Sequence, residues 1–205
     1  MPTPSSRIVC EPLLRTLHWM LAGAILALVA TSQLAEAFED GPYEDTIWTL
    51  HIYAGYTLAL ALATRVLWGL FGPASARWQD LWHPAAWKTA LTRLQRPRGH
   101  RAGHDPLASL AYLFLYGVAG LMVATGLLIA AAQFGVGPLS AWIEQSRSLA
   151  HLFKEPHEAG FVLVLGFVGL HLAALVFHQL RGERVAQSMI TGRQFPPGED
   201  QAAQD

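Results

Sequence analysis

The sequence predicts an all-α integral membrane protein, a transmembrane four-helix bundle with both termini on the cytoplasmic side. Hydrophobic residues make up 52% of the 205 residues and charged residues only 14%, whereas ordinary soluble chains carry about 25% charged residues. The charges lie between four apolar runs, each long enough for the roughly 20 helical residues that cross a bilayer. Because spanning helices satisfy their backbone polar groups internally, four such runs indicate a helical bundle.

The four apolar runs define the expected helices, which belong to a single transmembrane domain over residues 1–195, followed by a flexible tail over 196–205. The helices are expected over residues 13–38, 46–71, 107–134 and 157–181. The first run ends in Ala35-Glu36-Ala37, which resembles a signal-peptidase site. It is longer than the 7–15 apolar residues typical of a signal peptide, so we expect it to remain as a helix.

The charges between the helices predict the orientation in the inner membrane. The first connection holds five acidic residues and no Lys or Arg, while the middle connection is basic. Loops rich in Lys and Arg stay in the cytoplasm, so the middle loop and both termini are expected there. Within this loop, residues 76–95 alternate Trp and Leu with basic residues. This pattern predicts an amphipathic helix on the inner membrane surface; an irregular basic loop with Trp anchors is the alternative.

The composition also excludes several function classes. A single cysteine, Cys10, rules out an internal disulfide, a cysteine-based metal site and the covalent attachment of a c-type haem. The formal net charge of −1 gives no indication of nucleic-acid binding. Any haem in this chain would therefore be held non-covalently, as haem b.

Four histidines in the apolar runs point to the function, because polar side chains inside a membrane are costly and usually functional. His157 and His171 lie fourteen residues apart, which in a helix separates them by about 21 Å and returns them to within about 40° of one face. With alternating helix directions, His18 falls at the inner depth of His171, and His51 at the outer depth of His157. The sequence therefore predicts two pairs, His18 with His171 and His51 with His157.

Two imidazoles that face each other suit the axial positions of an iron porphyrin. Gly55 and Gly160 lie close to ligand histidines along their helices and would let a flat macrocycle approach, although ordinary helix packing also uses such glycines. Arg65 lies at the inner depth of the second helix, where a buried cation needs an anionic partner such as a haem propionate. Snorkelling to lipid headgroups is the alternative. Arg15, three residues before His18, is a weaker candidate for the same role.

Several short segments, spread over nearly the whole chain, form a recognisable set. They are Arg15-Thr16-Leu17-His18-Trp19, His51-Ile52-Tyr53-Ala54-Gly55 with Arg65, Gly103-His104-Asp105-Pro106-Leu107, His157-Glu158 with His171, and Ser188-Met189-Ile190-Thr191-Gly192-Arg193. This set resembles the bacterial cytochrome b561 family, which includes the cytochrome b subunits of nickel–iron hydrogenases. The resemblance implies a di-haem cytochrome b with its ligands at His18, His51, His157 and His171.

The resemblance further implies electron exchange between the membrane quinone pool, ubiquinone or menaquinone, and a periplasmic redox partner. That partner would be a c-type cytochrome, a dehydrogenase or a hydrogenase. Two other functions stay open at the level of the sequence. The chain could be a stand-alone oxidoreductase that passes electrons from a small diffusible donor to quinone. It could also be a histidine-lined metal or proton transporter, which would be expected to show paired carboxylates within the membrane.

Overall fold

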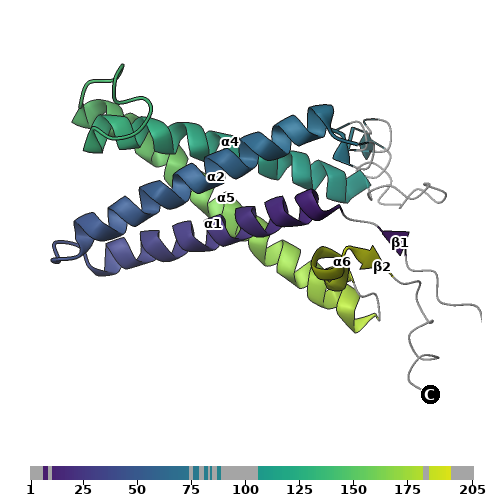
Figure 1. The fold of residues 1–205 in the computed structure, drawn as a ribbon. Helices are drawn as coiled ribbons and strands as arrows, with labels where there is room; N and C mark the ends of the chain where they lie inside the picture. The colour runs from purple at the N-terminus through teal and green to yellow at the C-terminus, as the bar shows by residue number, and fades with distance from the viewer. Residues whose placement is uncertain are drawn as a thin grey trace, which may run out of the picture.

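Four long helices make up most of the protein (Figure 1). The computed structural model describes residues 7–8, 11–73, 76–78, 81–82, 84, 87–88, 106–181 and 185–194. The long helices are α1 (Pro12–Ala37), α2 (Glu44–Phe71), α4 (Pro106–Phe134) and α5 (Arg147–Leu180). Each is long and apolar enough to cross a membrane. The prediction of an all-α membrane bundle with four spanning helices is confirmed.

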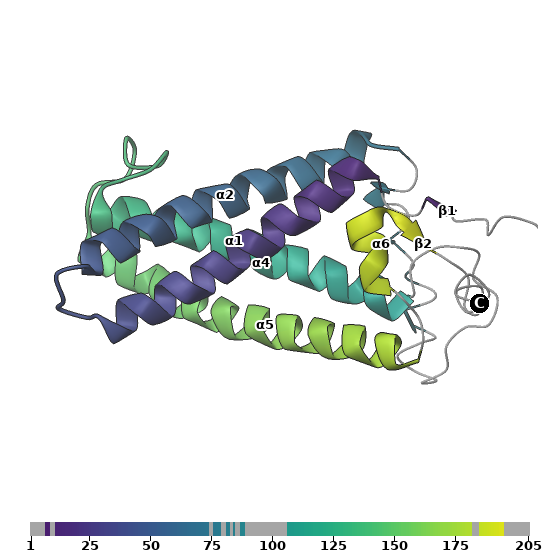
Figure 2. The same ribbon diagram turned by 60° about the horizontal axis from the view of Figure 1, so that its bottom comes forward.

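The helices form two hairpins that pack side by side (Figure 2). Helix α1 packs on α2, helix α4 packs on α5, and α2 joins the two hairpins by contacting α4. The start of α1 and the end of α5 lie at one end of the bundle, which we call the terminal end. The α1–α2 and α4–α5 connections lie at the opposite end, the loop end. That the terminal end faces the cytoplasm remains a prediction from the loop charges.

Local sequence explains where most helices begin. Pro12 occupies the first turn of α1, where its missing N–H costs no hydrogen bond. Glu44 and Asp45 lie in the first turn of α2 and complement the positive end of the helix dipole. Helix α4 begins at Pro106, one residue before the start expected from the apolar run.

Helix α5 is longer than predicted, because it begins at Arg147 rather than at residue 157. Ser146 caps it by accepting a hydrogen bond from the Leu149 backbone N–H at 3.3 Å, and Pro156 lies inside the helix. Hydropathy marks only the apolar part of a helix, so it does not detect the polar first turns of α5. At 1.5 Å per residue the 34 residues of α5 span about 51 Å, more than the roughly 30 Å of a bilayer core. His157 therefore lies within α5, not at its start.

The terminal end carries a short helix, α6 (Val185–Thr191), and a small two-stranded sheet. Strand β1 (Arg7–Ile8) pairs antiparallel with β2 (Arg193–Gln194). Helix α6 contacts the start of α1, where Trp19 donates a hydrogen bond to the Met189 carbonyl at 3.0 Å. The predicted flexible tail at 196–205 lies outside the described residues.

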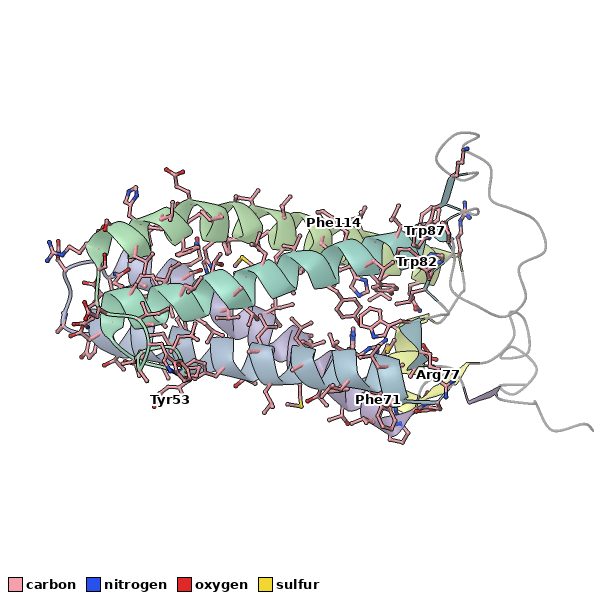
Figure 3. The ribbon with its side chains drawn as sticks, turned by 90° about the horizontal axis from the view of Figure 1, so that it is seen from above. Tyr53, Phe71, Arg77, Trp82, Trp87 and Phe114 are labelled. Atoms are coloured by element: carbon pink, nitrogen blue, oxygen red, sulfur yellow. The ribbon has the colours of Figure 1, made fainter. Side chains whose placement is uncertain are left out.

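Only part of the predicted amphipathic segment is described, so that prediction is not tested over its full length. Its described residues place Trp82 and Trp87 together at the terminal end (Figure 3), with ring centroids 5.1 Å apart. Trp87 also donates a hydrogen bond to the Ser109 hydroxyl at 3.2 Å. Tryptophan is enriched where a helix bundle leaves the bilayer. Large apolar side chains elsewhere point outward, for example Leu60 and Leu170, as expected for helices that contact lipid.

Candidate haem-binding sites

A cavity of about 670 Å³ opens among the four long helices at the loop end. Ligand pockets in proteins usually measure about 300–1,000 Å³. His51 from α2 and His157 from α5 both line this cavity, which is otherwise largely apolar. Its mouth carries charged side chains, namely Glu36, Glu39, Glu44, Lys154 and Glu158. The structure therefore brings the predicted outer pair to one cavity with apolar walls and an acidic mouth.

His51 is held by a threonine on the neighbouring helix. The Thr31 hydroxyl of α1 lies 3.0 Å from His51 Nδ1. The same hydroxyl donates to the Ala27 carbonyl at 2.7 Å and to the Leu28 carbonyl at 3.1 Å. Trp48 packs against the His51 ring edge-on, with ring centroids 5.7 Å apart. These contacts restrict both the position and the rotation of the imidazole.

His157 is held in the same way within the second hairpin. The Thr125 hydroxyl of α4 lies 2.9 Å from His157 Nδ1 and donates to the backbone carbonyls of Leu121 and Met122 at 2.8 and 3.2 Å. Gly126 leaves room for the ring, since a Cβ atom there would lie 3.2 Å from His157 Cε1. The two loop-end histidines thus have equivalent surroundings on two different hairpins.

The predicted inner pair lies at the terminal end. The His18 and His171 rings come from α1 and α5, and their centroids are 6.4 Å apart with an angle of 56° between the ring planes. Phe167 stacks on His171 at 6.1 Å, nearly parallel at 8°. Trp19 packs edge-on against His18 at 5.5 Å. Within the described part of the chain, neither ring has a hydrogen bond.

The spacing of this pair fits two axial ligands of one metal ion. A bond between a metal and an imidazole nitrogen is about 2.0–2.1 Å, so two imidazoles on opposite sides of one ion hold their centroids about 6 Å apart. The observed 6.4 Å agrees with this spacing. An imidazole would be free to rotate about a bond to the metal, so the angle of 56° between the ring planes does not conflict with this role. The donor set is therefore suited to a haem.

Arg65 is buried at the terminal end, with 7% of its surface exposed. Its guanidinium donates to the Ala76 carbonyl at 3.3 Å and lies 5.4 Å from the Trp78 ring and 5.7 Å from the Tyr116 ring. No carboxylate among the described residues forms a salt bridge with it. This burial does not fit the snorkelling interpretation. It leaves a cation inside the bundle that can attract an anionic group.

Arg15 lies at the terminal end, where it contacts the backbone of α6. Its Nη1 donates to the Ile190 carbonyl at 2.7 Å and so attaches α6 to α1. Its Nε is buried and has no hydrogen-bond partner in the described part of the chain. The side chain therefore stabilises the terminal end and retains one donor for an anion near His18.

The two predicted glycines differ in their surroundings. Gly55 lines the loop-end cavity, and a Cβ atom there would meet only Leu28, at 4.0 Å. Gly160 does not line the cavity; a Cβ atom there would collide with the Met122 sulfur of α4. The structure therefore favours the helix-packing interpretation for Gly160, whereas Gly55 is placed where a ligand could approach.

The sequence reasoning missed Thr31, Thr125 and Gly126. Threonine in an apolar helix usually bonds to the carbonyl four residues earlier, as Thr57 does at 3.1 Å. The sequence around Thr31 and Thr125 does not distinguish them from a threonine such as Thr57, which contacts no histidine among the described residues. Their role depends on the rotation and packing of neighbouring helices, which hydropathy does not report.

Comparison with known families agrees with this geometry. Residues 9–192 match the family described as prokaryotic cytochrome b561. The chain belongs to this family. It is also 26% identical to a probable Ni/Fe-hydrogenase B-type cytochrome subunit from Rhizobium leguminosarum bv. viciae, over 94% of this chain and 90% of the relative. No solved structure matches the chain.

Family membership and the four spanning helices identify the general class of the protein. It is a multi-pass cytochrome b of the inner membrane that binds haem b and serves electron transport. The structure brings His18 close to His171 at the terminal end, and places His51 and His157 around one cavity at the loop end.

Proposed function

We propose that the protein carries electrons across the membrane through two haem b groups. His18 and His171 would hold one haem at the terminal end, and His51 and His157 would hold the other at the loop end. The closeness of the His18 and His171 rings, whose centroids lie 6.4 Å apart, carries the argument. The loop-end cavity, lined by both His51 and His157, supports the second site.

A bound haem supplies one-electron exchange through its iron. The chain supplies the surroundings that make this exchange useful. The apolar walls of the loop-end cavity keep water away from the histidines, and Arg65 offers a cation for propionate at the terminal end. The two pairs are separated along α5 by about 21 Å of helix. Electrons therefore cross most of the bilayer inside one bundle.

We propose that the loop end faces the periplasm and exchanges electrons with a redox protein there, while quinone exchanges electrons within the membrane. The acidic mouth of the loop-end cavity supports a partner with a basic contact surface. The name of the Rhizobium relative makes a hydrogenase one candidate partner, beside a dehydrogenase or a c-type cytochrome. Purified protein that reduces quinone from a small donor, without any partner, would favour the stand-alone alternative.

Haem content tests the assignment of ligands. Purified wild-type protein should contain two non-covalent haems per chain by the pyridine haemochrome assay. His171→Ala and His18→Ala should each remove the same haem, and His51→Ala and His157→Ala should each remove the other. His151→Ala is the matched control, because His151 is an exposed histidine on the same helix as His157. Loss of one and the same haem in His157→Ala and His171→Ala would contradict the pairing.

A further inference from the structure

Each loop-end histidine is contacted by a threonine hydroxyl from the other helix of its own hairpin. Thr31 of α1 contacts His51 of α2, and Thr125 of α4 contacts His157 of α5. The oxygen–nitrogen distances are nearly equal, 3.0 and 2.9 Å. Both contacts involve Nδ1 of the imidazole, so the arrangement occurs twice around one cavity.

The backbone determines the direction of these hydrogen bonds. A hydroxyl has one proton, and each threonine directs it at carbonyl groups of its own helix, at 2.7 Å for Thr31 and 2.8 Å for Thr125. Carbonyl oxygens can only accept. The hydroxyl oxygen is then left to accept from the imidazole, whose proton lies on Nδ1. The Leu28 carbonyl also accepts from His51 and the Met122 carbonyl from His157, so the backbone favours a proton on the same side of each ring. This tautomer leaves the lone pair on Nε2, the nitrogen that is then able to bind a metal ion.

We propose that Thr31 and Thr125 are positioning residues that set the tautomer and basicity of the two loop-end ligands. This inference rests on the proposed function, because it assumes that His51 and His157 hold haem. A ligand imidazole that donates its second N–H is a stronger electron donor to the metal. A stronger donor stabilises the oxidised iron, so both threonines lower the reduction potential of the loop-end haem.

The effect is confined to the loop end. His18 and His171 have aromatic neighbours in place of hydroxyl groups, and their rings have no hydrogen bond within the part of the chain that the structure describes. Removing a threonine hydroxyl should therefore change the midpoint potential of the loop-end haem and leave that of the terminal-end haem unchanged.

The test uses the full-length protein with its haems and measures reduction potentials by optical titration, with the electron paramagnetic resonance spectrum of the oxidised iron as a second readout. Thr31→Val and Thr125→Val keep the approximate shape and remove the hydroxyl. Each should raise the midpoint potential of the loop-end haem and shift its resonance, while the terminal-end haem keeps its wild-type values. Thr31→Ser and Thr125→Ser, which retain the hydroxyl, should keep a midpoint close to wild type.

Thr57→Val is the matched control. The Thr57 hydroxyl also donates to a backbone carbonyl, at 3.1 Å, but the residue is exposed and does not line the cavity. Its substitution should leave both midpoints unchanged. If a valine variant loses the loop-end haem, the serine variant at the same position shows whether the hydroxyl or the packing is responsible. Recovery of haem and midpoint by serine supports the role of the hydroxyl, and equal loss in both variants contradicts it.

The outcomes also separate this inference from the proposed function. Suppose that His157→Ala loses one haem but both valine variants keep wild-type midpoints. The role of the threonines would then be overturned, and the ligand assignment would stand. A His51→Ala or His157→Ala protein that keeps both haems would overturn the ligand assignment, whatever the threonine variants show.

Discussion

The two ends of the bundle hold their histidines by different physical means. At the loop end, hydroxyl groups of Thr31 and Thr125 contact the rings at 3.0 and 2.9 Å. At the terminal end, Phe167 and Trp19 pack against the rings. A hydrogen bond is directional and selects one tautomer, whereas aromatic packing restricts position without selecting a protonated nitrogen. The surroundings at the loop end therefore act on the protonation of the rings, whereas those at the terminal end act only on their position.

The charges around the two ends differ as well. Carboxylates line the mouth of the loop-end cavity, while Arg15 and Arg65 are buried or partly buried near the terminal-end pair. Cations nearby stabilise an electron on the haem, and anions disfavour it. The hydrogen bonds to the histidines and the nearby charges should therefore both lower the reduction potential of a haem at the loop end relative to one at the terminal end.

The largest effect is expected at Arg65. Arg65→Met removes the buried cation, and a hydrogen bond to a charged group is worth about 1.5–3 kcal/mol. We expect roughly 10- to 100-fold weaker retention of the terminal-end haem, measured as haem per chain after washing in detergent. Arg65→Lys keeps the charge and should retain more haem. Full retention in Arg65→Met would show that propionate is held elsewhere.

The next effect concerns the order of the potentials. We expect the loop-end haem to have the lower midpoint, by tens of millivolts, since about 1.4 kcal/mol shifts a one-electron couple by about 59 mV. Redox titration of His171→Ala and His157→Ala, each with a single haem, assigns the two values. This order favours electron flow from the loop end to the terminal end. The opposite order would mean that the charge and hydrogen-bond contrasts do not control the potentials.

Helix packing at the loop end gives a smaller effect. Gly160→Ala forces the Met122 sulfur to move, and overpacking of this kind costs about 1–3 kcal/mol. Thermal unfolding in detergent should show a lower Tm. Adding Met122→Ala should recover part of the loss, because the two side chains compete for one space. If the effects of Gly160→Ala and Met122→Ala on Tm simply add, the contact between position 160 and the Met122 side chain would be contradicted.

The smallest effect is expected at Gly126. An alanine there would place Cβ 3.2 Å from His157 Cε1, so the ring must shift by a few tenths of an ångström. We expect a change in the loop-end haem spectrum with haem content close to wild type. Gly120→Ala on the same helix meets open space and should leave the spectrum unchanged. A shift of the terminal-end spectrum instead would contradict the assigned depths.

Local sequence was sufficient for much of this architecture. Apolar runs mark spanning helices because each run must bury its own backbone polar groups in lipid. The depth of each histidine follows from helix direction and a rise of about 1.5 Å per residue. His18 and His171 could therefore be paired in advance, and the structure brings their rings within 6.4 Å. The polar start of α5 escaped prediction because hydropathy detects lipid contact and not helix formation.

Which side chains meet between helices could not be read from the sequence. Thr31 and Thr57 have the same local pattern, yet only Thr31 faces a histidine. Gly55 and Gly160 lie at similar distances along the chain from their histidines, yet one lines the cavity and the other packs on Met122. These outcomes depend on the rotation of each helix about its axis and on its neighbours, which are set by the packing of all four helices together. The residues along each helix set which side chains it carries and at what height in the bundle, and the packing of the helices sets which groups contact which histidine.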